Sequence, residues 1–288
     1  EEELVKRVEK IIANGEIEID SENKIIWKKY PIARLKKGND YLSPEFDIIA
    51  DDSLNLESKT KLIKYLNKWL IDHINEVLED LIKLTKHKID NQYLRGLTFQ
   101  LYENNGVVKR SEVDQIVKSI PLGERKKLWG MGIKIGRYHI YLPKMLKPKA
   151  VLFRVGLWKI FNNLSDNNKI PQSGLNFLVN KNFEKKFLLL CGFEQFNEFF
   201  IRIDILEKLF IKIIDCTKDR KFKINADMMN LLGCSKENFY KLMTYMNYKK
   251  DKVVDTYVFK GERRKKEKLI KFDKKENPFN KLLSLNIK

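Results

Sequence analysis

FFIRIDILEKLFIKII, residues 199–214, is the stretch that decides the fold of the last third of the chain. FFIRI is typical of a strand, and the residues after it have the apolar spacing of an amphipathic helix. FKI (222–224), two short helical segments (226–246) and VVDTYVF (253–259) follow in order. A helix, a strand, two helices and a closing pair of strands is the order of a winged helix. We therefore predict a winged-helix-like domain over 197–260.

The third helix of this domain is the part that we expect to meet a ligand. Ser235 follows Gly233 and Cys234 and is a suitable N-cap for that helix. The apolar positions expected in the core are Leu231, Leu232, Phe239, Leu242 and Met246. The outward-facing candidates for nucleic-acid contact are Lys236, Asn238, Tyr240 and Lys241. Because this helix contains no Arg, direct reading of bases is not favoured, and a winged helix used for packing or protein contact is the alternative.

Upstream of this domain the pattern is mainly helical. Residues 1–55 read as a short helix followed by a β-rich segment, because EIEID, KIIWK and PIARL are brief strand-like runs. Apolar residues then recur at helical spacing, which predicts a helical bundle over 56–162. A turn-rich linker and a helix (163–196) lead to the winged helix, and a basic tail (261–288) ends the chain. The fold class predicted is thus mainly α, a helical bundle with a small β-rich N-terminal patch and a C-terminal winged-helix-like domain.

The charge of the chain indicates the kind of partner. The 57 Lys and Arg residues exceed the 39 Asp and Glu residues, which gives a formal net charge of +18. Such an excess favours a polyanionic partner, and a basic surface that serves only solubility is the alternative. No run of about eighteen apolar residues is present, so we expect no membrane partner and a cytoplasmic protein.

Catalytic and metal-binding motifs are not found. No phosphate-binding loop occurs, and the GxGxxxG spacing of Gly130, Gly132 and Gly136 lacks the preceding apolar strand of a dinucleotide fold. The cysteines and histidines are too widely spaced for a zinc site. These residues are Cys191, Cys216, Cys234, His73, His87 and His139. We expect reduced thiols, no metal, no cofactor and no catalytic centre in this chain.

GRYHIYLPKMLKPK, residues 136–149, interleaves cations with aromatic rings. This pattern suits a single strand of nucleic acid, because cations follow the phosphates while flat rings stack on bases. The alternation of Tyr138, Ile140 and Leu142 fits a buried strand equally well, so both interpretations stay open. The candidate contacts of this block are Arg137, Tyr138, His139, Tyr141, Lys144, Lys147 and Lys149.

A second basic element lies in the tail. KGERRKKEKLIKFDKK begins at Lys260 and crowds cations together, so we expect contacts with phosphates, with a solvated charge run as the alternative. The candidate residues are Arg263, Arg264, Lys265, Lys266 and Lys268.

Several strings resemble the C-terminal region of alphaproteobacterial DExH-box ATP-dependent helicases similar to the mitochondrial RNA-degradosome helicase. They are KIIWKKYPIARLKKGNDYLSPEFDIIADDSL, LNKWLIDHI, YLRGLTFQLYENNGVVKRSEV, MGIKIGRYHIYLPKMLKPKAVLFRVGLW, RIDILEKL, MMNLLGCS and NPFNKLLSL, and they cover nearly the whole chain. The positions that match the most recognisable block of the family are Gly136, Tyr138, His139, Tyr141, Leu142, Pro143, Leu146, Lys147 and Pro148.

This resemblance implies an ATP-driven RNA or DNA unwinding enzyme. Its motor domains, with their ATP and magnesium, would precede Glu1, so none of its catalytic residues is carried over to this chain. We therefore expect a non-catalytic, nucleic-acid-binding accessory region of an ATP-dependent RNA (or DNA) helicase, with single-stranded RNA or DNA as partner. The alternative is a protein-interaction adaptor that docks the parent helicase onto a nuclease or ribosome.

Overall fold

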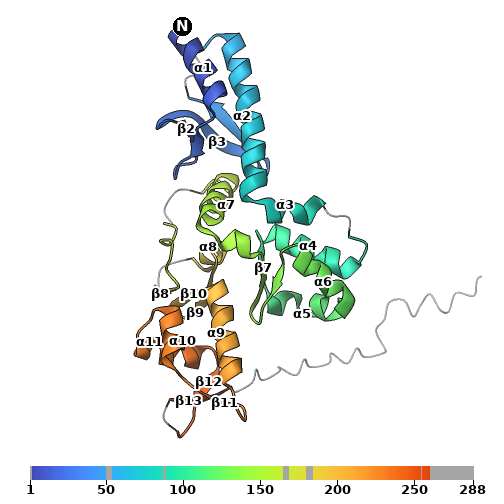
Figure 1. Cartoon of the computed structure of the whole chain (residues 1–288), viewed down its shortest axis with the longest axis vertical. Helices are drawn as coiled ribbons and strands as arrows, with labels where there is room; N and C mark the ends of the chain where they lie inside the picture. Colours follow the sequence, from blue (N-terminus) through green and yellow to red (C-terminus); the bar gives the residue numbers. More distant parts are fainter. Residues whose placement is uncertain are drawn as a thin grey trace, which may run out of the picture.

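Short strands recur along the described part of the chain, from Ile17 to Phe259. The computed structural model describes residues 2–49, 54–86, 89–164, 169–179, 184–253 and 255–259. Within these ranges the strands form four small antiparallel sheets, between and beside which the helices lie (Figure 1). The fold is therefore mixed α/β, and the predicted mainly α class was wrong.

The N-terminal unit is a four-stranded meander packed on two helices. Its sheet has the order β1-β2-β3-β4, and α1 lies against α2. The long helix α2 buries Leu62, Leu66, Leu70 and Ile74, which recur every fourth residue and so share one face. The elements are α1 (Glu2–Asn14), β1 (Ile17–Ile19), β2 (Lys24–Trp27), β3 (Tyr30–Asp40), β4 (Ser43–Ile48) and α2 (Leu56–Val77).

The middle of the chain contains a unit that the sequence did not predict. After α3 (Glu79–Lys86), a helix, a strand, two helices and two strands follow, and the sheet has the order β5-β7-β6. This is the order of a winged helix, so we call residues 92–141 the first winged helix. Its elements are α4 (Gln92–Glu103), β5 (Val107–Lys109), α5 (Arg110–Ser119), α6 (Leu122–Gly130), β6 (Lys134–Ile135) and β7 (His139–Tyr141).

The predicted helical bundle over 56–162 is corrected accordingly. The strands of the first winged helix contain only two or three residues each. A strand this short gives no alternation that can be separated from the helical pattern around it. The apolar residues at Val108 and Ile140 pair across the sheet and join the core beneath α4.

The last third repeats this topology. The helix α9 is followed by a strand, two helices and two strands, and the sheet has the order β11-β13-β12. We call residues 203–259 the second winged helix. Its elements are α9 (Ile203–Cys216), β11 (Lys221–Lys223), α10 (Ala226–Leu232), α11 (Lys236–Tyr245), β12 (Tyr248–Lys250) and β13 (Thr256–Phe259). Here the order of elements is the one expected from the sequence.

Local signals explain the boundaries of the two short helices in this unit. Gly233 ends α10 with φ of +68°, a left-handed conformation that favours glycine. The hydroxyl of Ser235 accepts a hydrogen bond from the backbone N–H of Asn238 at 3.3 Å and caps α11. Leu232, Phe239 and the other buried side chains of the unit form its own core.

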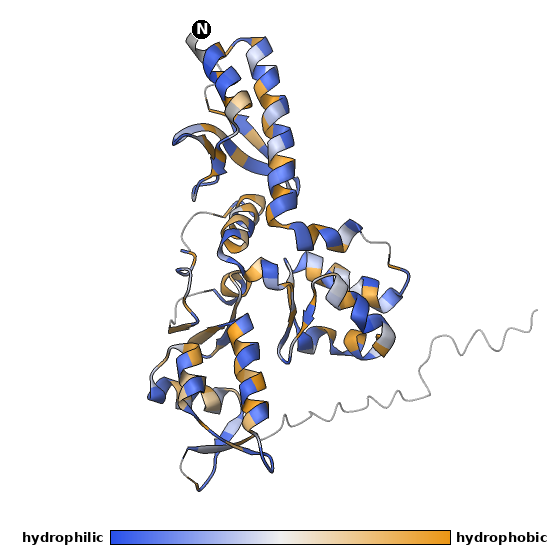
Figure 2. Ribbon diagram, in the orientation of Figure 1, coloured by the Kyte–Doolittle hydropathy of each residue, from blue (hydrophilic) through white to orange (hydrophobic). Residues whose placement is uncertain are grey.

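The helix α7 joins the units. Its ribbon is mostly orange in Figure 2, and its opposite faces enter two different cores. Phe153 and Leu157 belong to the core shared with the N-terminal unit, whereas Val151 and Val155 pack with α8. The connecting elements are η2 (Pro143–Leu146), α7 (Pro148–Phe161), β8 (Phe177–Val179), α8 (Lys185–Leu190), β9 (Phe193–Phe196) and β10 (Phe199–Arg202).

Candidate nucleic-acid interface

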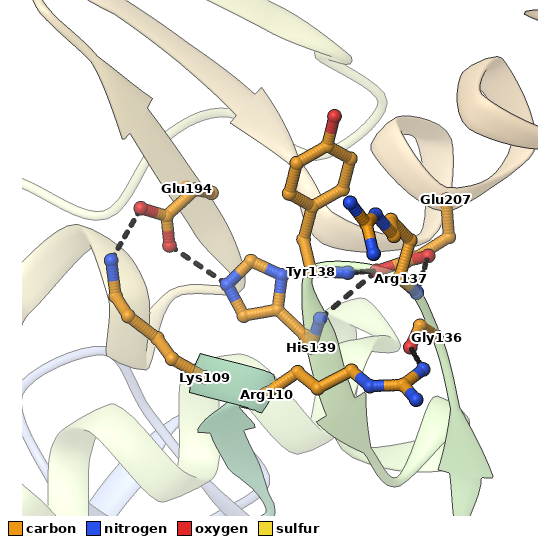
Figure 3. Close-up of polar contacts among 8 residues, drawn as sticks. All are labelled: Lys109, Arg110, Gly136, Arg137, Tyr138, His139, Glu194 and Glu207. Carbon is orange, nitrogen blue, oxygen red and sulfur yellow. Dashed lines mark hydrogen bonds and ion pairs between the residues drawn. The ribbon is translucent and has the colours of Figure 1, made fainter. Parts of the chain in front are cut away.

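The basic and aromatic block at 136–149 begins as the wing of the first winged helix. The turn between β6 and β7 presents its backbone N–H groups to the carboxylate of Glu207, which lies on α9 of the second winged helix (Figure 3). The N–H groups of Arg137, Tyr138 and His139 donate to this carboxylate at 2.6, 2.8 and 3.0 Å. The wing is thus closed onto a neighbouring unit.

The residues around this turn hold it in place from the other side. The guanidinium of Arg110 donates to the carbonyl of Gly136 at 2.8 Å, and the backbone N–H of Arg110 donates to the carbonyl of Tyr138 at 2.9 Å. A Cβ at Gly136 would lie 2.3 Å from Cδ of Glu207. Only glycine lets the carboxylate approach this closely.

A second carboxylate completes the contact between the two units. Glu194 on β9 bonds Nε2 of His139 at 2.7 Å and accepts from Nζ of Lys109 at 2.5 Å. Burial tends to raise the pKa of Glu194, but the hydrogen bonds from His139 and Lys109 outweigh burial and lower it. Glu194 is therefore held as a charged, fully partnered carboxylate inside the protein.

Apolar packing reinforces this joint. Tyr141 packs with Val107 and with Ile203, the first residue of α9. Tyr138 lies edge-on to Phe196 and Phe210, with ring centroids 6.2 and 5.8 Å apart. The polar and apolar contacts together make the first wing a structural element.

The predicted stacking of bases on this block is corrected at its rings. The side chains of His139 and Tyr141 are each only 1% exposed, and Tyr138 is half-buried. A buried ring cannot stack on a base at the surface. Of the two interpretations left open by the alternation, the buried strand is the one that the structure has.

Two lysines of the block are bound to acids. Nζ of Lys144 donates to Glu79 at 3.0 Å and to Asp80 at 2.9 Å. Nζ of Lys149 donates to Glu76 at 3.2 Å. These ion pairs neutralise much of the positive field that the sequence pattern offers to phosphates.

The remaining cations of the block are exposed. The guanidinium of Arg137 lies over the ring of Phe210, 5.7 Å from its centroid. The side chain of Lys147 is exposed at the start of α7. The block therefore contains buried or half-buried rings, two exposed lysines paired with acids, and two further exposed cations, and it does not form one contact strip.

The second winged helix has a different arrangement at its third helix and wing. Nζ of Lys236, from α11, and Nζ of Lys250, from β12, each lie 5.5 Å from the ring centroid of Tyr240. The hydroxyl of Tyr240 donates to Asp255, which also pairs with Lys236 at 3.5 Å. We call Lys236, Tyr240, Lys250, Asp255 and Tyr257 the Tyr240 cluster, because the ring of Tyr257 packs on that of Tyr240.

Electrostatics keep this cluster charged. The hydrogen bond from Tyr240 and the charge of Lys236 lower the pKa of Asp255. The hydrogen bond to Tyr240 and the charge of Asp255 raise the pKa of Lys236. The lysine therefore carries its full charge at neutral pH, at the surface where α11 meets the wing.

The structure places the four predicted residues of the third helix as follows. Lys236 and Lys241 are exposed, while Asn238 and Tyr240 are half-buried. The ring of Tyr240 is occupied by the wing rather than free for a base.

The sequence analysis did not predict the exposed cations on the sheet of the second winged helix, β11-β13-β12. Lys221 on β11 and Lys249 on β12 lie directly opposite Val258 on the central strand β13. Lys221 is also paired with Asp251 at 2.8 Å. Lys223 and Lys252 are also exposed. The alternation in KFK (221–223) is the signal that could have found two of them. The predicted tail contacts Arg263, Arg264, Lys265, Lys266 and Lys268 lie outside the described residues.

No family model, curated protein or solved structure matches this chain. Over the ranges that the structure describes, no helix has the length and apolar character needed to cross a membrane. Among the same residues, no group of three His, Cys, Asp or Glu side chains is arranged to hold a metal ion.

Proposed function

We propose that this chain is a non-catalytic, nucleic-acid-binding region of an ATP-dependent RNA or DNA helicase, and that its second winged helix is the principal contact. The observation that carries the proposal is the convergence of Lys236 and Lys250 on Tyr240. One lysine belongs to the third helix and the other to the wing, the two parts of this fold that lie side by side at one surface. The helicase part of the proposal comes from the sequence resemblance.

The chemistry of this surface suits phosphates rather than base edges. Its cations are lysines, which act as compact point charges, and the described part of α11 contains no Arg to form a bidentate contact with guanine. Lys241 on α11 and Lys252 after β12 are two more exposed cations near the cluster in sequence. Binding through such contacts is sequence-tolerant and falls as salt concentration rises.

The packed first wing gives this contact a mechanical role. Glu207 on α9 fixes the second winged helix to the first one through three backbone hydrogen bonds. A rigid joint transmits a displacement of one unit to the other, whereas a flexible linker would absorb it. We therefore infer that a strand held by the second winged helix is coupled to the rest of the parent helicase.

A titration with fluorescein-labelled twelve-nucleotide oligouridylate and oligothymidylate tests the proposal by fluorescence polarisation. Lys236→Glu with Lys250→Glu is expected to weaken binding roughly tenfold at about 0.1 M salt, because two attractive charges become repulsive. The matched control is Lys64→Glu with Lys68→Glu on the exposed face of α2, which changes the net charge equally. We expect little effect from this control.

Three results would contradict the proposal or a part of it. If the wild-type chain binds neither oligonucleotide at physiological salt, the adaptor that docks onto a nuclease or ribosome becomes the better interpretation. If both double variants weaken binding equally, only net charge matters and the second winged helix is not a site. Hydrolysis of ATP by this chain would contradict the non-catalytic part.

A further inference from the structure

The two winged helices have corresponding third helices. In the first unit α6 precedes the strands β6 and β7, just as α11 precedes β12 and β13 in the second. Because the first winged helix was not predicted, α6 was not among the predicted ligand contacts. The third helix is the element that winged and helix-turn-helix proteins present to nucleic acid.

The outer face of α6 carries large apolar side chains. Leu122 is 78% exposed and Trp129 is 72% exposed, and Lys126 is exposed between them. Positions separated by four and then three residues share one face of a helix. Leu128 is the buried residue of α6, so the helix has only a narrow contact with its own core.

The described residues leave this face open. A Cβ added to Gly123 or Gly130 would meet no atom within 4 Å. The ring of Trp129 makes no aromatic or cation–π contact within the described ranges. Leu122 and Trp129 therefore expose two large apolar side chains on one open helix face, and exposed apolar patches rimmed by polar residues mark interaction sites.

A cation lies beside the tryptophan on the same helix face. Lys126 is three residues before Trp129, one turn of α6 away, and its side chain is exposed. The acid in the first turn of α6, Glu124, is paired with Lys127 at 2.8 Å, so its charge is offset near Lys126.

We propose that the α6 face, formed by Leu122, Lys126 and Trp129, binds an unpaired stretch of the nucleic acid, with Trp129 stacked on a base and Lys126 on a flanking phosphate. A flat indole with a cation beside it matches a single strand, in which bases are unstacked and the backbone is charged. This inference rests on the proposed function and adds to it a second contact of a different chemical kind. In this proposal the second winged helix binds phosphates, whereas Trp129 of the first winged helix stacks on an unpaired base.

Fluorescence of the protein itself provides the test. Trp27 is only 7% exposed and Trp69 and Trp158 are half-buried, so Trp129 is the most exposed indole among these four. Titration with unlabelled twelve-nucleotide oligouridylate is expected to quench the emission, and Trp129→Leu is expected to remove the quenching. By polarisation, Trp129→Leu should bind labelled oligouridylate about five- to a hundredfold more weakly, the loss typical of one stacked base. Trp129→Phe keeps a flat ring and should retain most of the affinity.

The control variant is Tyr30→Leu, which removes a 58% exposed ring from β3 in the N-terminal unit. It should leave the affinity unchanged. Circular dichroism and thermal melting check that each variant is folded, and because Trp129 is mostly exposed, large losses of stability are not expected.

The outcomes separate this inference from the proposed function. If Trp129→Leu binds oligouridylate as the wild type does, while Lys236→Glu with Lys250→Glu weakens binding, the α6 site is rejected and the proposed function stands. If Trp129→Leu leaves the affinity unchanged but abolishes self-association in sedimentation velocity, the face is a protein contact and the inference is overturned. If the wild type binds no oligonucleotide, both proposals fail.

Discussion

The first and second winged helices share their topology but use their wings in opposite ways. The wing of the first is held by Glu207 and Arg110, and its rings are buried between units. The wing of the second meets its own third helix through Tyr240 and Asp255 and keeps its lysines exposed. The first wing is therefore part of the packing between the two units, whereas the lysines of the second wing are exposed to solvent.

The sequences of the two turns explain this difference. The first, GRYH (136–139), offers a glycine that lets a carboxylate approach the backbone, followed by an aromatic ring and an imidazole that pack. The second, KKDKVVDT (249–256), is rich in charged side chains that favour water or a charged ligand. A shared fold does not fix a shared function, because function lies in the side chains placed on it.

The largest expected effect is the loss of stability when the Glu207 carboxylate, which holds the first wing, is removed. Glu207→Ala leaves three backbone N–H groups of the first wing without an acceptor, so we expect the free energy of unfolding to fall by about 3 kcal/mol. Chemical denaturation monitored by circular dichroism measures the change. Asp215→Ala, an exposed acid on the same helix, is the control and should change it by less than about 0.5 kcal/mol. Equal losses of stability in the two variants would mean that the hydrogen bonds to Glu207 do not hold the first wing in place.

A methyl group at the turn tests the same contact sterically. Gly136→Ala would place Cβ 2.3 Å from Cδ of Glu207, so the wing must shift, at a cost of about 1–3 kcal/mol in the free energy of unfolding. The same substitution at Gly130 meets open space and should be neutral or slightly stabilising. A thermal melt of the two variants distinguishes them, and a stable Gly136→Ala protein would argue against the close approach.

The buried Glu194 gives the joint a dependence on pH. Its pKa is lowered in the folded protein, so its contribution to stability is fully present above its ordinary pKa of 4.5 and is lost as the pH falls through the lower folded value. We expect Glu194→Gln to reduce the loss of stability below pH 4.5, measured by denaturation at a series of pH values. The same dependence in the variant and the wild type would show that Glu194 is not the group responsible.

The smallest expected effect concerns the acid in the second wing. Asp255→Asn keeps an acceptor for Tyr240 while removing a negative charge beside Lys236. If phosphates approach the Tyr240 cluster, oligouridylate should bind on the order of twofold more tightly at low salt. Weaker binding instead would indicate that Asp255 is needed to place Lys236 and the wing.

Local signals made the second winged helix predictable. Its helices are amphipathic, Gly233 and Ser235 mark the boundary between two of them, and the helical period correctly put Lys236 and Lys241 on the exposed face. These features depend on neighbours within a turn or two of helix, which the sequence displays directly.

Long-range contacts account for what was missed. The strands of the first winged helix are too short to be recognised singly, and they become a sheet only when Val108 meets Ile140. Glu207 lies 70 residues along the chain from Arg137, and no sequence pattern indicates that the two residues are in contact. For the same reason, the contact of the Lys250 ammonium with the ring of Tyr240 could not be predicted from the sequence of α11 alone.

The salt dependence of oligouridylate binding tests most directly that one wing is structural and the other binds. For Lys236→Ala with Lys250→Ala, we expect the slope of the logarithm of the binding constant against the logarithm of salt concentration to become shallower by about 1.4, or about 0.7 for each lost phosphate contact. For Arg137→Ala, in the first wing, combined with Lys147→Ala, at the start of α7, we expect the wild-type slope. A shallower slope in the Arg137 and Lys147 variant, with an unchanged slope in the other, would contradict the assignment of the two wings.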